Sequence, residues 1–102
     1  MAYDDRRDEN EPAIVAALNK RGDTVIRLGR GVGADLLVIN ACGVHVAEVK
    51  DPTKKWRYTD SEKRLRAACA KHGVQYHVLM WTHDIYEIPF MPPAQPGDTK
   101  CR

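Results

Sequence analysis

The sequence predicts an α/β domain with the element order αβββαβ. An alanine-rich stretch at 11–20 is typical of a helix, and a charged stretch at 60–72 again has helical spacing. Short apolar stretches bounded by glycine and other turn residues lie between and after these two helices, as expected of strands. With 102 residues, of which 43% are hydrophobic and 29% charged, the chain has the length and composition of one globular domain with a modest core.

The first helix is expected over residues 11–20. Pro12 is tolerated in a first helical turn, and residues 8–10 are candidate caps. Glu11 and Leu18 lie on one stripe, seven residues apart, so the Glu11 carboxylate is predicted to face the core. A core-facing position is unusual for an acid.

Three strands are expected next. Residues 24–28 are rich in β-branched side chains, and residues 35–40 form a nearly continuous apolar stretch. A tight turn at 41–43 leads into a returning strand at 44–50, so these last two strands are predicted to form a hairpin. The loop at 29–33 contains three glycines, which indicates unusual backbone geometry.

The second helix is expected from Asp60 or Ser61, either of which can cap it, to about residue 72. Gly73 is a natural stop. The last predicted strand covers residues 75–81. The core stripe of the second helix is predicted to consist of Leu65, Ala68 and Cys69.

The predicted organisation is an N-terminal tail at 1–8, a folded domain at 9–88 and a flexible C-terminal tail at 89–102. No apolar run approaches the roughly 20 residues that cross a bilayer, and the start is too charged for a signal peptide. We therefore expect a cytoplasmic protein without a membrane partner. The three cysteines are widely separated and are interpreted as reduced thiols.

The formal net charge of +2 hides an uneven distribution. Residues 1–12 carry five acids against two bases, whereas residues 50–72 carry eight bases against three acids. A basic stretch on a nearly neutral chain suits a phosphate backbone, and a solvated helix face is the alternative. The candidate DNA contacts are Arg30, Lys54, Lys55, Arg57, Lys63 and Arg64.

Two charged residues end the strand at 44–50. Strand alternation places Glu48 and Lys50 on the same face. An acid and a base at the end of an apolar strand must pair, bind a metal or meet solvent in a cleft. They are therefore candidate catalytic residues.

A third charged group, Asp35, begins the preceding strand. Pairing about a turn centre at residue 42 places Asp35 opposite residue 49, give or take a bulge. Two carboxylates from adjacent strands, Asp35 and Glu48, supply the oxygen ligands that Mg²⁺ or Mn²⁺ prefers. Lys50 beside them can orient or deprotonate an attacking water. This trio predicts a phosphodiester-cleaving centre.

The spacing of these residues resembles a known family. Asp35, twelve further residues and then Glu48-Val49-Lys50 resemble the PD-(D/E)xK nuclease signature. Within this superfamily the chain is most similar to stand-alone virus-type replication-repair (VRR-NUC) nucleases and archaeal-type Holliday junction resolvases, many of them phage-encoded. The resemblance covers residues 9–79. It implies a restriction-endonuclease-like αβββαβ core with a central mixed sheet flanked by helices, which makes residues 9–88 a nuclease domain.

The resemblance also implies roles for individual residues. Asp35 and Glu48 would bind Mg²⁺ or Mn²⁺, and the Val49 backbone carbonyl would complete the shell. Lys50 would orient or deprotonate the attacking water. Glu11 would be an auxiliary catalytic acid that reaches the metal directly or through water.

Two positions depart from the family pattern. The usual proline before the first aspartate is Ala34 here. Many relatives have a glutamine early in the second helix, where this chain has Glu62, which is therefore a candidate auxiliary acid. Structural alternatives remain for every acid: Asp35 as a turn or cap residue, Glu48 with Lys50 as a solvated pair, and Glu11 and Glu62 as favourable acids of a first helical turn.

The resulting functional hypothesis is a Mg²⁺-dependent DNA endonuclease that cuts branched DNA, such as Holliday junctions, as a homodimer. The resemblance suggests a phage-encoded protein that acts in a bacterial host. One alternative is a catalytically idle nuclease fold that binds DNA or a protein partner. Another is a restriction-like or RNA-directed nuclease.

Overall fold

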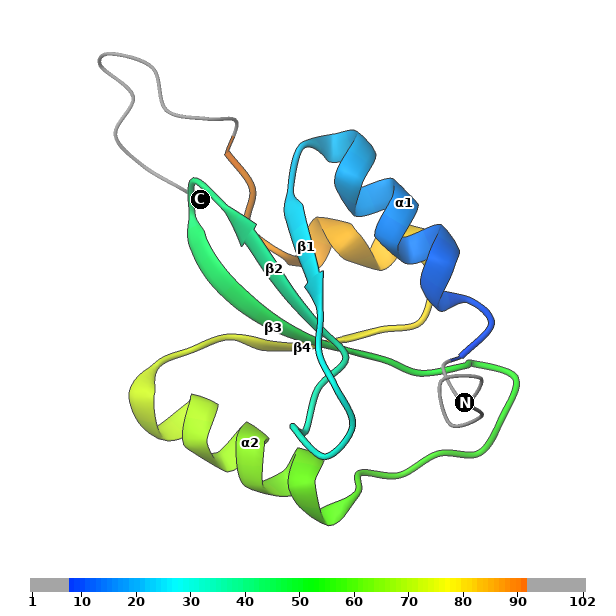
Figure 1. Ribbon diagram of the computed structural model, residues 1–102, viewed down its shortest axis with the longest axis vertical. Coiled ribbons are helices and arrows are strands. Elements are labelled where there is room, and N and C mark those ends of the chain that lie inside the picture. Colours follow the sequence, from blue (N-terminus) through cyan, green and yellow to red (C-terminus); the bar gives the residue numbers. More distant parts are fainter. Residues whose placement is uncertain (1–7, 92–102) are drawn as a thin grey trace.

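The computed structural model describes residues 8–91 and contains one four-stranded sheet between helices (Figure 1). The predicted order αβββαβ is confirmed, and a 3₁₀ helix follows it where the sequence pattern assigned no element. The elements are α1 (Glu11–Arg21), β1 (Thr24–Arg27), β2 (Leu36–Asn40), β3 (Gly43–Val49), α2 (Asp60–His72), β4 (Tyr76–Leu79) and η2 (Thr82–Glu87).

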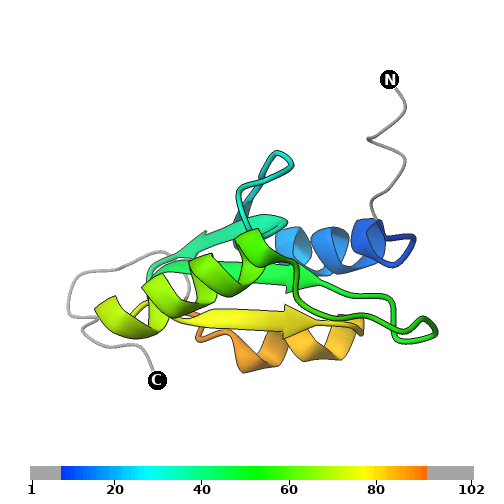
Figure 2. The same ribbon diagram turned by 90° about the horizontal axis from the view of Figure 1, so that it is seen from below.

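The sheet has the strand order β1-β2-β3-β4. The first three strands are antiparallel neighbours, and β4 returns through α2 to lie parallel to β3. The predicted mixed sheet flanked by helices is therefore confirmed. Figures 1 and 2 show α2 on one side of the sheet, and α1 with η2 on the other.

Each face of the sheet has its own hydrophobic cluster. The larger cluster joins strand residues such as Leu36 and Val38 to α1 and η2. The smaller one joins Ala34, Val46 and Cys69 beneath α2. Because strand side chains alternate, the even-numbered residues of β3 that follow Val46 also lie on the α2 side of the sheet.

The β2–β3 hairpin turns at Ala41 and Cys42, and its register differs by one residue from the predicted one. The Cys42 N–H donates to the Asn40 side chain at 2.6 Å, and Gly43 has a φ of 117°, which favours glycine. This two-residue loop pairs Asn40 with Gly43 and Leu36 with Ala47. The expectation that Asp35 lies opposite residue 49 is therefore wrong by one position.

Helix α2 begins one residue earlier than expected because its cap is Thr59, not Asp60 or Ser61. The Thr59 hydroxyl accepts from the Glu62 N–H at 3.2 Å, and the Thr59 N–H donates to the Glu62 carboxylate at 2.9 Å. This reciprocal pair is a capping box. Glu62 is thereby fixed at both its backbone and its side chain.

The core stripe of α2 is narrower than predicted. Cys69 is buried and Leu65 half-buried, whereas Ala68 is exposed. Residues 65 and 69 are one helical turn apart and lie on the same side of the helix, whereas residue 68 is turned away from that side. Because α2 contacts the sheet only along the side that carries residues 65 and 69, residue 68 stays exposed. Gly73, with a φ of 75°, ends the helix as expected.

The cysteines only partly match their interpretation as reduced thiols. Cys69 is a free, buried thiol, but Cys42 is disulfide-bonded, so the interpretation is wrong for Cys42. Cys101 lies outside the described residues.

Only the first three residues of the predicted C-terminal tail are described. Two of them contact the domain: Asn40 donates to the Pro89 carbonyl at 2.9 Å, and the Arg21 guanidinium lies 4.6 Å from the centre of the Phe90 ring. The predicted N-terminal tail, Asp8 excepted, lies outside the described range. Within residues 8–91, no helix is both long enough and apolar enough to span a membrane.

Candidate active site

Glu48, in β3, and Lys50, directly after it, have side chains on the same side of the sheet, as strand alternation predicted. Lys50 Nζ lies 2.8 Å from Glu48 Oε2, and the two side chains are almost buried. The same ammonium donates to both carboxylate oxygens of Glu62 in α2, at 3.1 and 3.2 Å. One cation therefore lies between two carboxylates, which brings the predicted auxiliary acid into the site.

Three carboxylates influence one another around this ammonium. Burial, the adjoining Glu62 carboxyl and the charge of Asp35 raise the pKa of Glu48 to about 8, although Lys50 acts in the opposite direction. Burial also acts to raise the pKa of Glu62, but hydrogen bonds from Glu48, the Thr59 N–H and Lys50 outweigh it and lower that pKa. At neutral pH the proton of this pair therefore resides on Glu48.

Lys50 stays protonated in these surroundings. Burial alone would lower the pKa of Lys50, but its hydrogen bonds to Glu48 and Glu62 outweigh burial and raise that pKa. The Lys50 side chain is consequently a hydrogen-bond donor and a positive charge.

Asp35 lies immediately before β2 and is held by three backbone contacts. Its N–H donates to the Ala47 carbonyl at 3.0 Å, and its carbonyl accepts from the Leu28 N–H at 2.8 Å. Asp35 Oδ2 accepts from the Val49 N–H at 2.7 Å. Because the N–H and C=O of a strand residue point to the same neighbour, the Val49 carbonyl also faces the Asp35 end of β2.

The glycine loop before Asp35 packs directly against α2. Gly33 has a φ of 106°, and a Cβ added there would collide with the Ser61 backbone and lie 2.9 Å from the Leu65 Cβ. Gly31 also has a positive φ, 84°, so the unusual geometry predicted for this loop is confirmed at two of its glycines. The absence of a side chain at Gly33 lets the start of α2, with Glu62, approach the sheet.

Tyr76 is a site residue that the sequence pattern did not reveal. Its hydroxyl donates to the Gly33 carbonyl at 2.8 Å and lies 3.4 Å from Glu48 Oε1. Burial, followed by the neighbouring acids, raises the pKa of Tyr76, so the hydroxyl keeps its proton. The pairing of Tyr76 with Val46 across the parallel β3–β4 ladder positions it.

Asn10 was expected only as a helix cap, but its side chain connects three elements. Its Nδ2 donates to the Lys50 carbonyl at 3.0 Å and to the Met80 carbonyl at 2.8 Å, and it makes no side-chain cap bond. The start of α1 is thereby fastened to the ends of β3 and β4. This contact holds the backbone of Lys50, not its side chain.

Glu11 is buried, as its place on the helical stripe predicted, and its Oε2 accepts from Arg27 Nε at 3.1 Å. Across residues 8–91, no group of three or more His, Cys, Asp or Glu side chains is arranged to hold a metal ion. The structure therefore does not join Glu11 with Asp35 and Glu48 into such a group. A catalytic or metal-binding role for Glu11 stays a prediction.

The chemistry of the remaining donors suits Mg²⁺ or Mn²⁺. Mg²⁺ is usually bound by one or two carboxylates and otherwise by water and phosphate oxygens, so Asp35 and Glu48 are enough. Burial is the main cause of the raised pKa of Glu48, and the neighbouring Glu62 and Asp35 act in the same direction, so a divalent cation would favour the charged form of this carboxyl. The Val49 carbonyl is a further hard oxygen on the same side.

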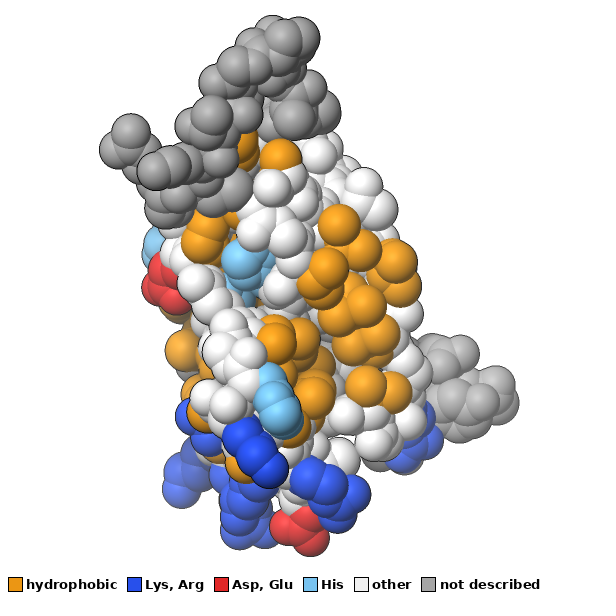
Figure 3. All heavy atoms as spheres, turned by 90° about the vertical axis from the view of Figure 1, so that its left-hand side faces the viewer, with side chains coloured by type: hydrophobic (Ala, Val, Ile, Leu, Met, Phe, Trp, Pro, Cys, Tyr) orange, Lys and Arg blue, Asp and Glu red, His pale blue; other side chains and the backbone are white. Residues whose placement is uncertain are grey.

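The predicted DNA-contacting side chains lie on three segments, and all of them are exposed. Arg30 belongs to the glycine loop, which Figures 1 and 2 show beside α2. Lys54, Lys55 and Arg57 belong to the loop after β3, while Lys63 and Arg64 lie on α2. Figure 3 shows Lys and Arg side chains gathered at the lower end of the molecule, where α2 lies.

Comparison with known proteins bears on this arrangement. No family model matches the chain, and no curated protein matches it. A solved structure of a VRR_NUC domain superimposes on it with a TM-score of 0.59 and 25% sequence identity, over 78% of this chain and 92% of that chain. The chain has the VRR-NUC nuclease fold.

The VRR-NUC fold confirms the relationship that the Asp35 to Lys50 spacing predicted, and with it the restriction-endonuclease-like architecture. Such a fold indicates a nuclease. In this VRR-NUC fold, Asp35, Glu48 and Lys50 lie at the open end of the β2–β3 hairpin, opposite its turn. Glu62 from α2 joins them there.

Proposed function

We propose that this chain is a metal-dependent endonuclease that hydrolyses DNA phosphodiester bonds with Asp35, Glu48 and Lys50. The observation that carries this proposal is that three carboxylates, those of Asp35, Glu48 and Glu62, are gathered near the single ammonium of Lys50, so that carboxylates are in surplus there. A divalent cation would neutralise that surplus. The VRR-NUC fold supports the nuclease chemistry.

Asp35, Glu48 and the Val49 carbonyl would hold Mg²⁺ or Mn²⁺. Bound there, the ion would polarise a phosphate oxygen and stabilise the charge that develops on the reacting phosphate. The bond from the Val49 N–H to Asp35 Oδ2 keeps that carboxylate oriented before metal arrives. Glu48 must lose its proton for metal to bind, because ligating carboxylates are deprotonated.

Lys50 acts as a donor that positions the attacking water or a phosphate oxygen. Glu48 and Glu62 fix its ammonium and raise its pKa, which makes it a poor proton acceptor. Of the two predicted roles, orienting the water and deprotonating it, these contacts favour the first. Glu62 is a positioning residue for Lys50.

The deciding experiment is cleavage of labelled linear, flapped and four-way DNA with Mg²⁺, with Mn²⁺ or with EDTA. We expect cutting that EDTA abolishes. Asp35→Asn and Glu48→Gln should each lower the rate by more than about a hundred-fold, the loss typical of removing one group that stabilises transition-state charge. Asp60→Asn, an exposed acid at the start of α2, is the matched control and should cut like the wild type.

Three outcomes contradict the proposal. Cutting by both variants at the wild-type rate removes the assignment of the site. Binding without cutting under every metal condition indicates a catalytically idle module, and preference for RNA or for one short sequence indicates the other nuclease classes.

We also propose that the substrate is branched DNA, such as a four-way junction. The exposed bases lie on three separate segments around α2, a distribution that suits contacts to several phosphates. Phosphate contacts read the shape of DNA rather than its sequence. In the same cleavage assay, four-way DNA should be cut faster than linear duplex of equal length.

A homodimer would bring two sites to one junction. Ile26 and Val44 are about half exposed, on the same sheet face as Glu48. Figure 3 shows hydrophobic side chains at the surface on this side, and such patches commonly mark interfaces. Light scattering after gel filtration should give twice the chain mass, and Val44→Glu should shift it to the monomer.

A further inference from the structure

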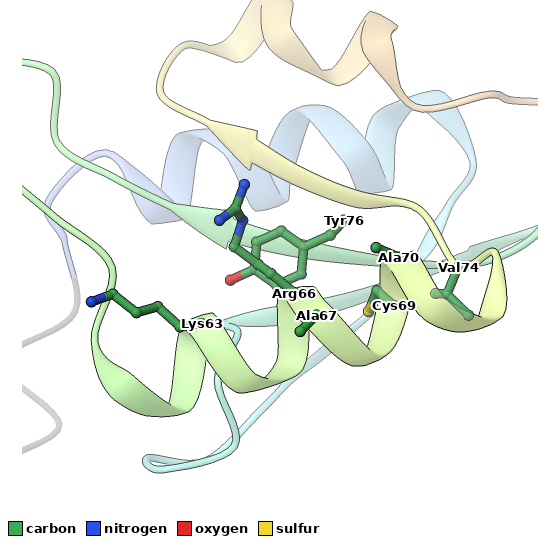
Figure 4. Close-up of a pocket in the computed structure, with 7 residues that line it drawn as sticks. All are labelled: Lys63, Arg66, Ala67, Cys69, Ala70, Val74 and Tyr76. Atoms are coloured by element: carbon green, nitrogen blue, oxygen red, sulfur yellow. The ribbon is translucent and has the colours of Figure 1, made fainter.

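A pocket of about 440 Å³ lies between α2 and β4 (Figure 4). Its apolar lining includes Ala67, Ala70 and Val74, which are small and exposed. Arg66 and Tyr76 line its other side, and Lys63 lies at one end. The volume falls within the range of small-molecule sites, and the mixture of apolar lining with a few polar groups is typical of them.

Aromatic rings and a planar cation alternate beside this pocket. The Arg66 guanidinium carbon lies 3.9 Å from the centre of the Tyr58 ring and 5.9 Å from that of Tyr76. Figure 4 shows the Arg66 side chain reaching from α2 across the Tyr76 ring. Nucleobases stack on aromatic rings and on guanidinium planes, so the surface suits a flat heteroaromatic ring.

The pocket is connected to the candidate active site through one residue. The Tyr76 ring lines the pocket, while its hydroxyl lies 3.4 Å from Glu48 Oε1. The bond from that hydroxyl to the Gly33 carbonyl fixes the ring between the two places. A nucleotide held in the pocket would therefore be close along the strand to a phosphate at Glu48.

We propose that this pocket receives an unpaired nucleobase of the DNA strand whose neighbouring phosphate lies at Asp35, Glu48 and Lys50, an assignment that rests on the proposed function. A base inside a duplex is stacked on both faces and cannot enter a pocket until it leaves the stack. Lys63 at the pocket end carries the charge that a flanking phosphate requires. The pocket thus selects DNA in which a base can leave its stack, as at a flap or at the crossover of a branch, over fully paired linear duplex.

The test is a binding measurement in EDTA, so that no cleavage is needed. The probe is a fluorescent duplex with a short single-stranded flap, compared with copies that carry an abasic site at successive flap positions. Loss of one stacked base should weaken binding about five- to a hundred-fold at one position and little elsewhere. Equal affinity for every abasic probe overturns the proposal.

Two α2 variants localise the effect. Ala70→Leu fills the pocket and should abolish the difference between intact and abasic probes while blunt duplex still binds. Ala68→Leu places the same side chain on the same helix outside the pocket lining and should behave like the wild type. A base preference that survives Ala70→Leu places the base elsewhere and contradicts the proposal.

Arg66→Gln separates base stacking from phosphate contact and also serves if Ala70→Leu fails to fold. If Arg66 stacks on a base, the variant should lose more affinity for the flap probe than for blunt duplex. An equal loss of affinity for both probes identifies Arg66 as a phosphate contact and overturns the proposal that the pocket binds a base. Metal-dependent cleavage together with binding that does not depend on the flap base would reject only the proposal that the pocket binds a base. Base-dependent binding without cleavage would reject the proposed function alone.

Discussion

Two buried carboxylates, those of Asp23 and Glu48, have opposite electrostatic surroundings. Both oxygens of Asp23 accept from the Arg21 guanidinium, at 2.7 and 2.9 Å, and Asn40 adds a third bond at 2.7 Å. Glu48 instead shares the ammonium of Lys50 with Glu62. The Asp23 carboxylate therefore has a cationic partner that it shares with no other acid among these contacts, whereas Glu48 shares its cationic partner with Glu62.

This difference separates a structural acid from a functional one. Arg21 also donates to the carbonyls of Ile85 and Ile88, so its pair with Asp23 fastens the end of α1 to η2. Bidentate pairs of this kind hold geometry strongly. The Glu48 carboxyl instead keeps a proton at neutral pH, and a bound divalent cation would displace that proton. The predictions below test the contrast.

Removing the charge of Asp23 should have the largest effect on stability. Asp23→Asn leaves the guanidinium of Arg21 buried without its anion, and breaking such a pair costs about 3–5 kcal/mol. Urea denaturation measures the loss, with the exposed Asp60→Asn as the control. A loss below about 1 kcal/mol would contradict the structural role of this pair.

Metal binding should be the next largest effect, and only at the Glu48 site. Mg²⁺ or Mn²⁺ at a hundred times its Kd should stabilise the wild type by about 2.7 kcal/mol at pH 8, measured by thermal unfolding. Glu48→Gln should remove this gain because it removes a carboxylate ligand. An equal gain in wild type and variant would place the ion elsewhere.

Stability of the metal-free chain should fall as pH rises from 6.5 to 8. The pKa of Glu48 is near its ordinary value of 4.5 when unfolded and about 8 when folded, so the folded state holds an extra proton in this interval. By linkage, the free energy of unfolding then decreases with pH, by at most about 1.4 kcal/mol per unit. Glu48→Gln mimics the protonated acid and should remove this slope.

Two histidines also contribute to the pH dependence of stability. Burial lowers the pKa of His45 and of His77, which adds an opposite slope below pH 6.5. Subtracting the variant curve cancels it.

Loss of the α2 cap should have the smallest effect. Thr59→Ala removes the hydroxyl that accepts from the Glu62 N–H and should cost about 1 kcal/mol. Thr53→Ala, in the exposed loop after β3, should stay within about 0.5 kcal/mol. A cap loss no larger than this control would mean that packing alone fixes the start of α2.

The central part of the site could be predicted because it depends on local pattern. Alternation along β3, continued into the residue that follows it, places Glu48 and Lys50 on one face whatever the rest of the fold does. Helical spacing likewise predicted the burial of Glu11 but not its partner, Arg27, which belongs to another element. A periodic pattern determines which face a side chain occupies, not what meets it there.

The sequence by itself determined the order of the elements, the shared face of the acid and base, and the glycine loop, because each depends on neighbouring residues. Only the tertiary structure decided the hairpin register, the contact of Tyr76 with Glu48, and the pairing of Asp23 with Arg21. Register follows from the loop that Asn40 and Gly43 close, where one residue changes every pairing. Tyr76 reaches Glu48 only because β4 returns through α2 to lie parallel to β3, a long-range packing that no local pattern encodes.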